Sequence, residues 1–193
     1  MADGPDGTVA PPPRVGPAPL LTFAGKDGAG RGVVEGAMPS TPLTRPMPTG
    51  RDPRRARLVA LADGTAVLVR HQTRHDREQV LGLYDGMSPR SRQLRFFTGM
   101  PGALPARLLD ALSDVDGERH VALLAIHQGR AVAAARYVRD PRDPSRADLA
   151  FAVADAFQRR GVARVLLGEL VAHAACAGVQ ELVFDTLGEN AGA

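Results

Sequence analysis

The sequence predicts an α/β fold, with a mixed, mostly antiparallel sheet flanked by helices and preceded by a disordered tail. Pro and Gly occupy 20 of the first 56 positions, a density that resists helix and strand alike. Beyond residue 56, short apolar stretches of strand character alternate with stretches of helical periodicity, separated by turn residues. Residues 1–56 are therefore predicted to be a Pro/Gly-rich tail, including a linker at Gly28–Gly32, and residues 57–193 one compact domain.

The first half of the domain is predicted to contain a hairpin and three helices. Asp63-Gly64 is a turn pair between two apolar stretches, which favours paired strands. The predicted elements are, in order, strands at 58–62 and 65–70, helices starting near Asp76 and at Ser88-Pro89, and a helix at 104–112. Leu94, Phe96 and Phe97 are expected to supply much of the aromatic core.

The second half is predicted to continue the sheet and end in a crossover. Apolar runs and turn residues indicate strands at 121–126, 131–138 and 148–153. Apolar residues at four-residue spacing from Val162 to Ala174 indicate an amphipathic helix that Gly178 ends. A last strand at 181–186 would then lie parallel to the strand before the helix.

Charge and composition exclude several classes of function. The tail carries 7 cations and 5 anions, which leaves 17 cations against 16 anions in the domain, too balanced for a nucleic-acid-binding face. The single Cys176 permits no intrachain disulfide and no cysteine-rich metal site. The longest apolar run, Val121–Ile126, is too short to cross a bilayer, and the N-terminus lacks a secretory signal. We therefore expect a cytoplasmic protein with no metal, membrane or nucleic-acid partner.

The segment with the clearest chemistry is the strand-to-helix junction at Gln158-Arg159-Arg160-Gly161-Val162-Ala163. Backbone N–H groups at a helix N-terminus bind anions, and Gly161 would let the backbone approach a phosphate closely. Arg159, Arg160 and Arg164 could add cationic contacts. Taken alone, the same pattern also fits a helix N-terminus with solvated arginines.

This Q/R-x-x-G-x-G/A pattern resembles the acetyl-CoA loop of the GNAT N-acetyltransferases. Further stretches resemble the bacterial protein-lysine acetyltransferase branch of that family, and Asn190 is similar to the Asn that closes its cofactor groove; the stretches are Ser88-Pro89, Ser91-Arg92, 94–97 and 136–141. The resemblance implies a GNAT-like fold with acetyl-CoA as cosubstrate. The cofactor-binding residues it implies are Val153, Gln158, Arg159, Arg160, Gly161, Val162, Ala163, Arg164 and Asn190.

The resemblance also implies the chemistry of transfer. A free lysine has a pKa near 10.4, so the attacking amine must lose a proton before it can attack directly. Asp148 stands where this branch usually has Glu and is the predicted base, acting through water because its side chain is one methylene shorter. An ion pair of Asp148 with Arg146 or Arg136 is an equal alternative. A backbone amide near Val153 would polarise the thioester, and Tyr137 is a weaker candidate acid than a packed tyrosine.

The end of the chain shapes the remaining expectations. GNAT domains normally continue with a helix and two strands beyond the Asn segment, so a chain ending at Ala193 is expected to be a C-terminally truncated domain. The strand at 181–186 would then have an unpaired edge and promote self-association. The predicted function is acetyl transfer from acetyl-CoA to a primary amine, with a protein lysine favoured over a small amine. The alternative is a non-catalytic acyl-CoA-binding module or a fragment that another chain completes.

Overall fold

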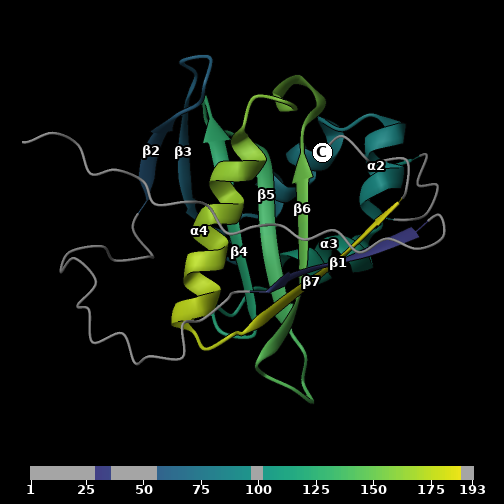
Figure 1. The fold of residues 1–193 in the computed structure, drawn as a ribbon. Helices are drawn as coiled ribbons and strands as arrows, with labels where there is room; N and C mark the ends of the chain where they lie inside the picture. Colours follow the sequence, from purple (N-terminus) through teal and green to yellow (C-terminus); the bar gives the residue numbers. More distant parts are fainter. Residues whose placement is uncertain (1–28, 36–55, 97–101, 188–193) are drawn as a thin grey trace, which may run out of the picture.

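A computed structural model of the protein describes residues 29–35, 56–96 and 102–187, and these form a seven-stranded sheet with helices on both faces (Figure 1). The strand order is β1-β7-β6-β5-β4-β3-β2, and within the described residues only β6 and β7 pair in parallel. The strands are β1 Ala29–Glu35, β2 Arg57–Ala60, β3 Ala66–His71, β4 His120–His127, β5 Arg130–Arg139, β6 Arg146–Val153 and β7 Glu181–Leu187. The helices are α1 Arg77–Asp85, α2 Pro89–Phe96, α3 Ala106–Ser113, the short 3-10 helix η1 Asp155–Phe157 and α4 Val162–Cys176. The α/β fold class and the elements predicted after residue 56 are confirmed.

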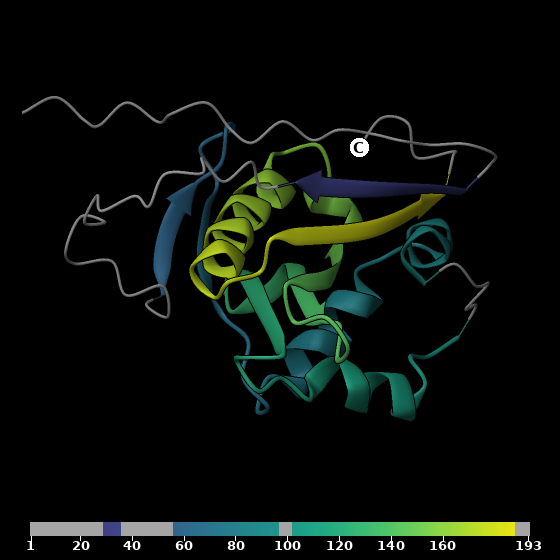
Figure 2. The ribbon, with the colours of Figure 1, turned by 60° about the horizontal axis from the view of Figure 1, so that its bottom comes forward.

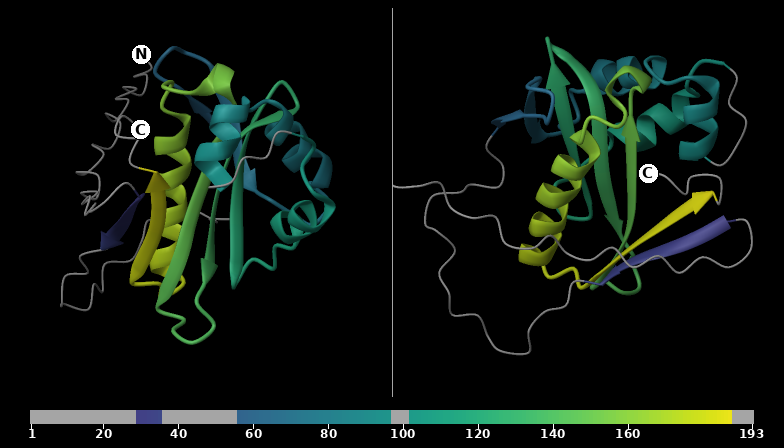
Figure 3. Two further views of the ribbon diagram at one scale, coloured as in Figure 1. Left: turned by 90° about the vertical axis from the view of Figure 1, so that its right-hand side faces the viewer. Right: turned by 45° about the horizontal axis from the view of Figure 1, so that its top comes forward.

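Helix α4 is the one described helix on its face of the sheet (Figure 3). Its buried residues are Val162, Leu166, Leu170 and Ala174, spaced four apart so that they form one stripe. They pack against residues of β4, β5 and β6 in the largest apolar cluster. Full burial of an aliphatic side chain contributes about 1.5–3 kcal/mol, so this stripe holds the start of α4 firmly beside the end of β6.

Helices α1, α2 and α3 lie over the opposite face (Figure 3). Leu83 of α1 packs on the sheet, and the Tyr84 hydroxyl donates a hydrogen bond to the Gly102 carbonyl at 3.0 Å. Of the residues expected in the aromatic core, Phe96 packs partly buried against the cluster of Val80, Tyr84, Leu104 and Leu109, and Leu94 is also only partly buried. Phe97 lies outside the described residues.

Strand β1 corrects the prediction that residues 1–56 are disordered throughout. Residues Ala29–Glu35, which include most of the expected linker, pair antiparallel with Leu187–Glu181 along the whole of β7 (Figure 2). The prediction of an unpaired edge on the last strand is wrong for the same reason. An exposed strand edge offers a row of free N–H and C=O groups, and the seven residues of β1 pair with that row despite the glycines among them.

We expect deletion of residues 1–36 to cause self-association. Without β1, the apolar strand β7 would present its N–H and C=O groups to other chains. A deletion of residues 1–26 keeps β1 and is the matched control. Light scattering at equal concentrations should give a higher mean mass for the longer deletion alone; equal masses would show that β1 does not protect the edge.

An ion pair fastens the N-terminus of α1 to β3. Arg70 donates from Nη1 and Nη2 to the two carboxylate oxygens of Asp76 at 2.8 and 2.5 Å, and the Thr73 N–H donates to Asp76 Oδ2 at 2.7 Å. The hydrogen bond from Arg70 is the main cause that lowers the pKa of Asp76 from 3.8 to about 2. The ionised carboxylate therefore stabilises the folded state, because the native protein holds this proton less tightly than the unfolded chain.

Asp76→Asn should destabilise the fold by about 2 kcal/mol at neutral pH, since it leaves a half-buried guanidinium without its charge partner. A lowered pKa gives stability that is complete above about pH 4 and disappears as the pH falls toward 2. The difference between the variant and the parent in urea unfolding should therefore shrink between pH 6 and pH 3. Asp114→Asn, which breaks the exposed pair with Arg74, is the control and should cost under about 1 kcal/mol.

Candidate functional site

The parallel strands β6 and β7 separate soon after they meet (Figure 1). Their pairing covers Arg146–Asp148 and Glu181–Val183, although β6 continues to Val153 and β7 to Leu187. Ala154 donates its N–H to the Val132 carbonyl of β5 at 2.9 Å. Because antiparallel strands direct alternate residues to opposite edges, the N–H groups of Phe151 and Val153 point toward the side that β7 leaves. This edge of β6 can accept an extended ligand.

The loop after β6 ends at the N-terminus of α4. Gly161 caps the helix with a left-handed φ of +85°, and a Cβ placed there would meet no atom within 4 Å. The Val165 N–H donates to the Gly161 carbonyl at 3.2 Å, so the N–H groups of Val162, Ala163 and Arg164 precede the first intrahelical bond. Open space above a glycine and three successive helix-terminal donors fit the pyrophosphate of CoA.

Gln158, a predicted cofactor contact, is exposed, and its side chain bonds neighbouring segments of the protein. Its Nε2 donates to Ser91 Oγ at 3.0 Å, to Asp155 Oδ1 at 3.1 Å and to the Val153 carbonyl at 3.3 Å. These bonds join α2, η1 and the end of β6. Gln158 therefore positions the loop through its side chain.

A second set of bonds anchors the same loop to the α1–α2 turn. Asp155 donates its N–H to the Gly86 carbonyl at 3.1 Å and accepts from the Ser88 N–H at 3.2 Å. Burial raises the pKa of Asp155, but hydrogen bonds from Ser91 and Ser88 outweigh it and hold the pKa below its usual value. Asp155 was absent from the predicted site. The three-residue spacing of Ser88 and Ser91 was a sequence signal for the capped start of α2, to which Asp155 bonds. In the structure, Ser88 Oγ accepts from the Ser91 N–H at 3.2 Å in the first turn of that helix.

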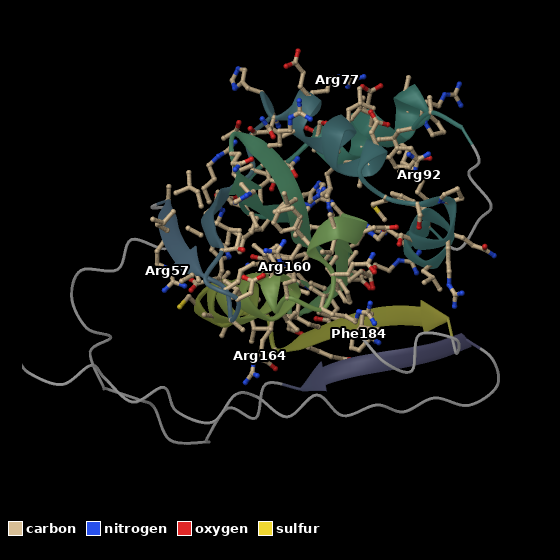
Figure 4. The ribbon with its side chains drawn as sticks, turned by 90° about the horizontal axis from the view of Figure 1, so that it is seen from above. Arg57, Arg77, Arg92, Arg160, Arg164 and Phe184 are labelled. Carbon is tan, nitrogen blue, oxygen red and sulfur yellow. The ribbon has the colours of Figure 1, made fainter. Side chains whose placement is uncertain are left out.

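The three predicted arginines separate into two groups. Arg160 donates from Nε to Asp63 Oδ2 at 2.5 Å, also bonds Thr65, and stacks on Phe157 with its Cζ 4.6 Å from the ring centroid. It thus ties the loop to the β2–β3 turn. Arg159 and Arg164 are exposed, and Arg164 projects away from Arg160 (Figure 4). Arg159 adopts a positive φ of 58°, a strained conformation for a residue with a side chain.

Asp148 is exposed on β6, opposite Val138 of β5 and Val183 of β7. Both arginines of the alternative ion-pair hypothesis have other partners. Arg146 Nη2 lies 3.3 Å from Glu181 Oε1, and Arg136 Nη1 donates to the Leu112 carbonyl at 2.7 Å. The structure therefore gives the Asp148 carboxylate neither of the predicted ion pairs.

Tyr137 proves to be a packed tyrosine. It is fully buried on the face that α4 covers, and its hydroxyl lies 3.1 Å from His173 Nδ1. Burial raises the pKa of Tyr137. Its neighbour Val138 pairs with Asp148, so Tyr137 and Asp148 point to opposite faces of the sheet. Tyr137 cannot act as the acid beside Asp148. Asn190 lies outside the described residues.

A small cavity of about 30 Å³ lies on the face that carries Asp148, between the sheet and helices α1 and α2. Arg95 and Arg136 line it, and the sequence had predicted neither as a substrate-binding residue. The remaining described lining residues are Val80, Leu83, Tyr84, Met87, Phe96, Leu112, Ala134, Ala150, Phe151 and Ala152.

Comparisons with known proteins place this arrangement in a family. The family model for the acetyltransferase (GNAT) family matches residues 90–193, more than half of the chain, and the chain belongs to that family. The GNAT domain of S. lividans PAT is 32% identical and superimposes with a TM-score of 0.65 over 70% of this chain and 80% of that domain.

Two further relatives share only part of their length with this chain. An acetyltransferase of Pseudomonas aeruginosa is 33% identical over 116 residues, which are 58% of this chain and 61% of that protein. A cAMP-binding acyltransferase from Mycobacterium smegmatis is 27% identical with a TM-score of 0.50, over 70% of this chain and 39% of that one.

No helix among the described residues has the length and apolar character needed to cross a membrane. The described residues also contain no group of three or more potential metal-ligating side chains.

Proposed function

We propose that the protein transfers an acetyl group from acetyl-CoA to a primary amine, with a protein lysine as the favoured acceptor. The observation that carries the proposal is the position of the Gly161-capped helix α4 at the point where β6 and β7 diverge. One face of this junction offers helix-terminal N–H groups for phosphates, and the adjoining strand edge offers backbone groups for an extended arm. Family membership and the likeness to a protein acetyltransferase domain support the same function.

Backbone N–H groups of the chain would make most of the contacts with CoA. The N–H groups of Val162, Ala163 and Arg164 receive the pyrophosphate, and the exposed Arg159 and Arg164 lie close enough in sequence to add charge. The pantetheine arm pairs with the free edge of β6. The N–H groups of Phe151 and Val153 point to that edge, so either can hydrogen-bond to the thioester oxygen and stabilise the negative charge that develops on it.

Asp148 is the proposed base. It removes one proton from the acceptor ammonium, and the neutral nitrogen then attacks the thioester carbon. As the carbon–sulfur bond breaks, the second proton that the nitrogen loses goes to the CoA sulfur, which leaves as the thiol. Asp148 precedes Phe151 by three residues, about 10 Å along an extended strand. A carboxylate at that distance receives the proton through water rather than directly, in line with its exposed position.

The test uses the full chain with two measurements. Calorimetry should detect binding of CoA and acetyl-CoA, and a thiol-release assay should detect transfer to a lysine-containing peptide in preference to a small amine of equal charge. Binding without any transfer would favour the non-catalytic acyl-CoA-binding module. Absence of binding to both compounds would overturn the proposal.

A further inference from the structure

Two guanidinium groups line the cavity beneath α1 and α2, and no acidic side chain stands among its described lining residues. Arg136 is 7% exposed. The Arg95 side chain makes no hydrogen bond or ion pair with a described residue, and its Cζ lies 4.9 Å from the centroid of the Phe96 ring. Like charges brought together in an apolar surrounding are unfavourable unless an anion joins them.

The hydrogen bonds of Arg136 leave part of its donor capacity free. Nη1 donates to the Leu112 carbonyl and lies 3.2 Å from His120 Nε2, and Nη2 donates to Gln72 Oε1 at 3.3 Å. These three partners are all uncharged or weakly basic, and a guanidinium has five N–H groups. Burial is the main cause that lowers the pKa of Arg136 to about 9, and the charge of Arg95 adds to it. Burial lowers the pKa of Arg95 to about 10, so both groups stay charged at neutral pH.

The cavity also lies where the reactants of the proposed function would meet. Ala150 and Ala152 of β6 line it, and they share a face of the strand with Asp148. Its volume of about 30 Å³ corresponds to about two water molecules, the size of a carboxylate group. Guanidinium groups bind carboxylates through paired, charge-assisted hydrogen bonds.

We propose that this cavity binds a carboxylate carried by one of the two reactants, held between Arg95 and Arg136. The inference rests on the proposed function, because it assigns the substrate class of the same site. The carboxylate has two possible sources, the far end of a dicarboxylic acyl chain on CoA or an acid group of the acceptor. In either case the reaction is unchanged, since the amine nitrogen bonds to the thioester carbon while the bond from carbon to sulfur breaks.

The test uses the full chain and compares reactants that carry the extra carboxylate with counterparts that lack it. Succinyl-CoA is set against acetyl-CoA as donor, and Nα-acetyllysine against its amide as acceptor. We expect one carboxylate-bearing reactant to exceed its counterpart in kcat/KM by about 10- to 100-fold. Arg95→Met should abolish that preference and leave the rate with acetyl-CoA and the Nα-acetyllysine amide unchanged. Arg90→Met, on an exposed position of the same helix, is the matched control and should retain the preference.

A binding measurement separates this proposal from the proposed function. Succinate alone should raise the Tm of the parent and of Arg90→Met but not of Arg95→Met, whether or not CoA binds. Failure to bind CoA with an Arg95-dependent effect of succinate would overturn the function and keep the carboxylate site. Equal rates for reactants with and without the extra carboxylate, or a preference that survives in Arg95→Met, would overturn the carboxylate site.

Discussion

Asp148→Asn is expected to lower the rate of acetyl transfer by about 10²- to 10⁴-fold, the usual contribution of one general base. The substitution keeps the shape of an exposed side chain on a well-paired strand, so the fold and the affinity for CoA should not change. The loss should appear in kcat at saturating acetyl-CoA, because the base acts only after both reactants are bound. Stopped-flow or steady-state thiol release can measure it.

Two controls make the Asp148 result specific. Asp148→Glu restores a carboxylate on a longer side chain and should retain or raise the rate. Asp140→Asn changes an Asp near the end of β5 by the same atoms and should leave the rate unaltered. A rate within a few-fold of the parent in Asp148→Asn would remove this residue from the mechanism.

Gly161→Glu is expected to weaken CoA binding by about 100-fold or more, which corresponds to about 2.7 kcal/mol. The new carboxylate would occupy the open space over the helix N-terminus and repel the phosphates that we place there. The left-handed φ of +85° adds strain to any side chain at this position, which costs about 1–2 kcal/mol of stability.

Gly161→Gln separates these two effects, because it carries the same bulk and the same strain without the charge. The melting temperatures of the two variants should match, whereas calorimetry should show the larger loss of CoA affinity in Gly161→Glu. Parental affinity in a folded Gly161→Glu variant would remove the loop from the CoA site.

Interactions between residues that are neighbours in the chain explain which parts of the site the sequence could predict. Gly161 stands out because a glycine between a strand and a helix indicates a special backbone conformation, and the structure gives it a positive φ. The four-residue spacing of Val162, Leu166, Leu170 and Ala174 likewise predicts the buried stripe of α4. These signals depend on neighbours in the chain, so the sequence shows them directly.

The sequence did not show which partners the polar and charged side chains of the loop would bond. Arg160 and Gln158 stand in the predicted phosphate loop, yet their side chains bond Asp63 and Ser91, which are 97 and 67 residues away. Tertiary packing decides such contacts, because a long polar side chain takes whichever partner the fold brings near. The loop motif therefore predicts a backbone binding site, which stays a prediction, but it could not show which partners the loop side chains would take.

The sequence by itself determined the order of strands and helices, the crossover that makes β6 and β7 parallel, and the membership of the GNAT family that these motifs indicated. Only the tertiary structure decided that Ala29–Glu35 covers the edge of β7 and that Arg95 and Arg136 share a cavity. The physical reason is the range of the forces involved. Periodicity and turn conformation act between neighbours in the chain, whereas edge pairing and charge burial join residues that only folding brings together.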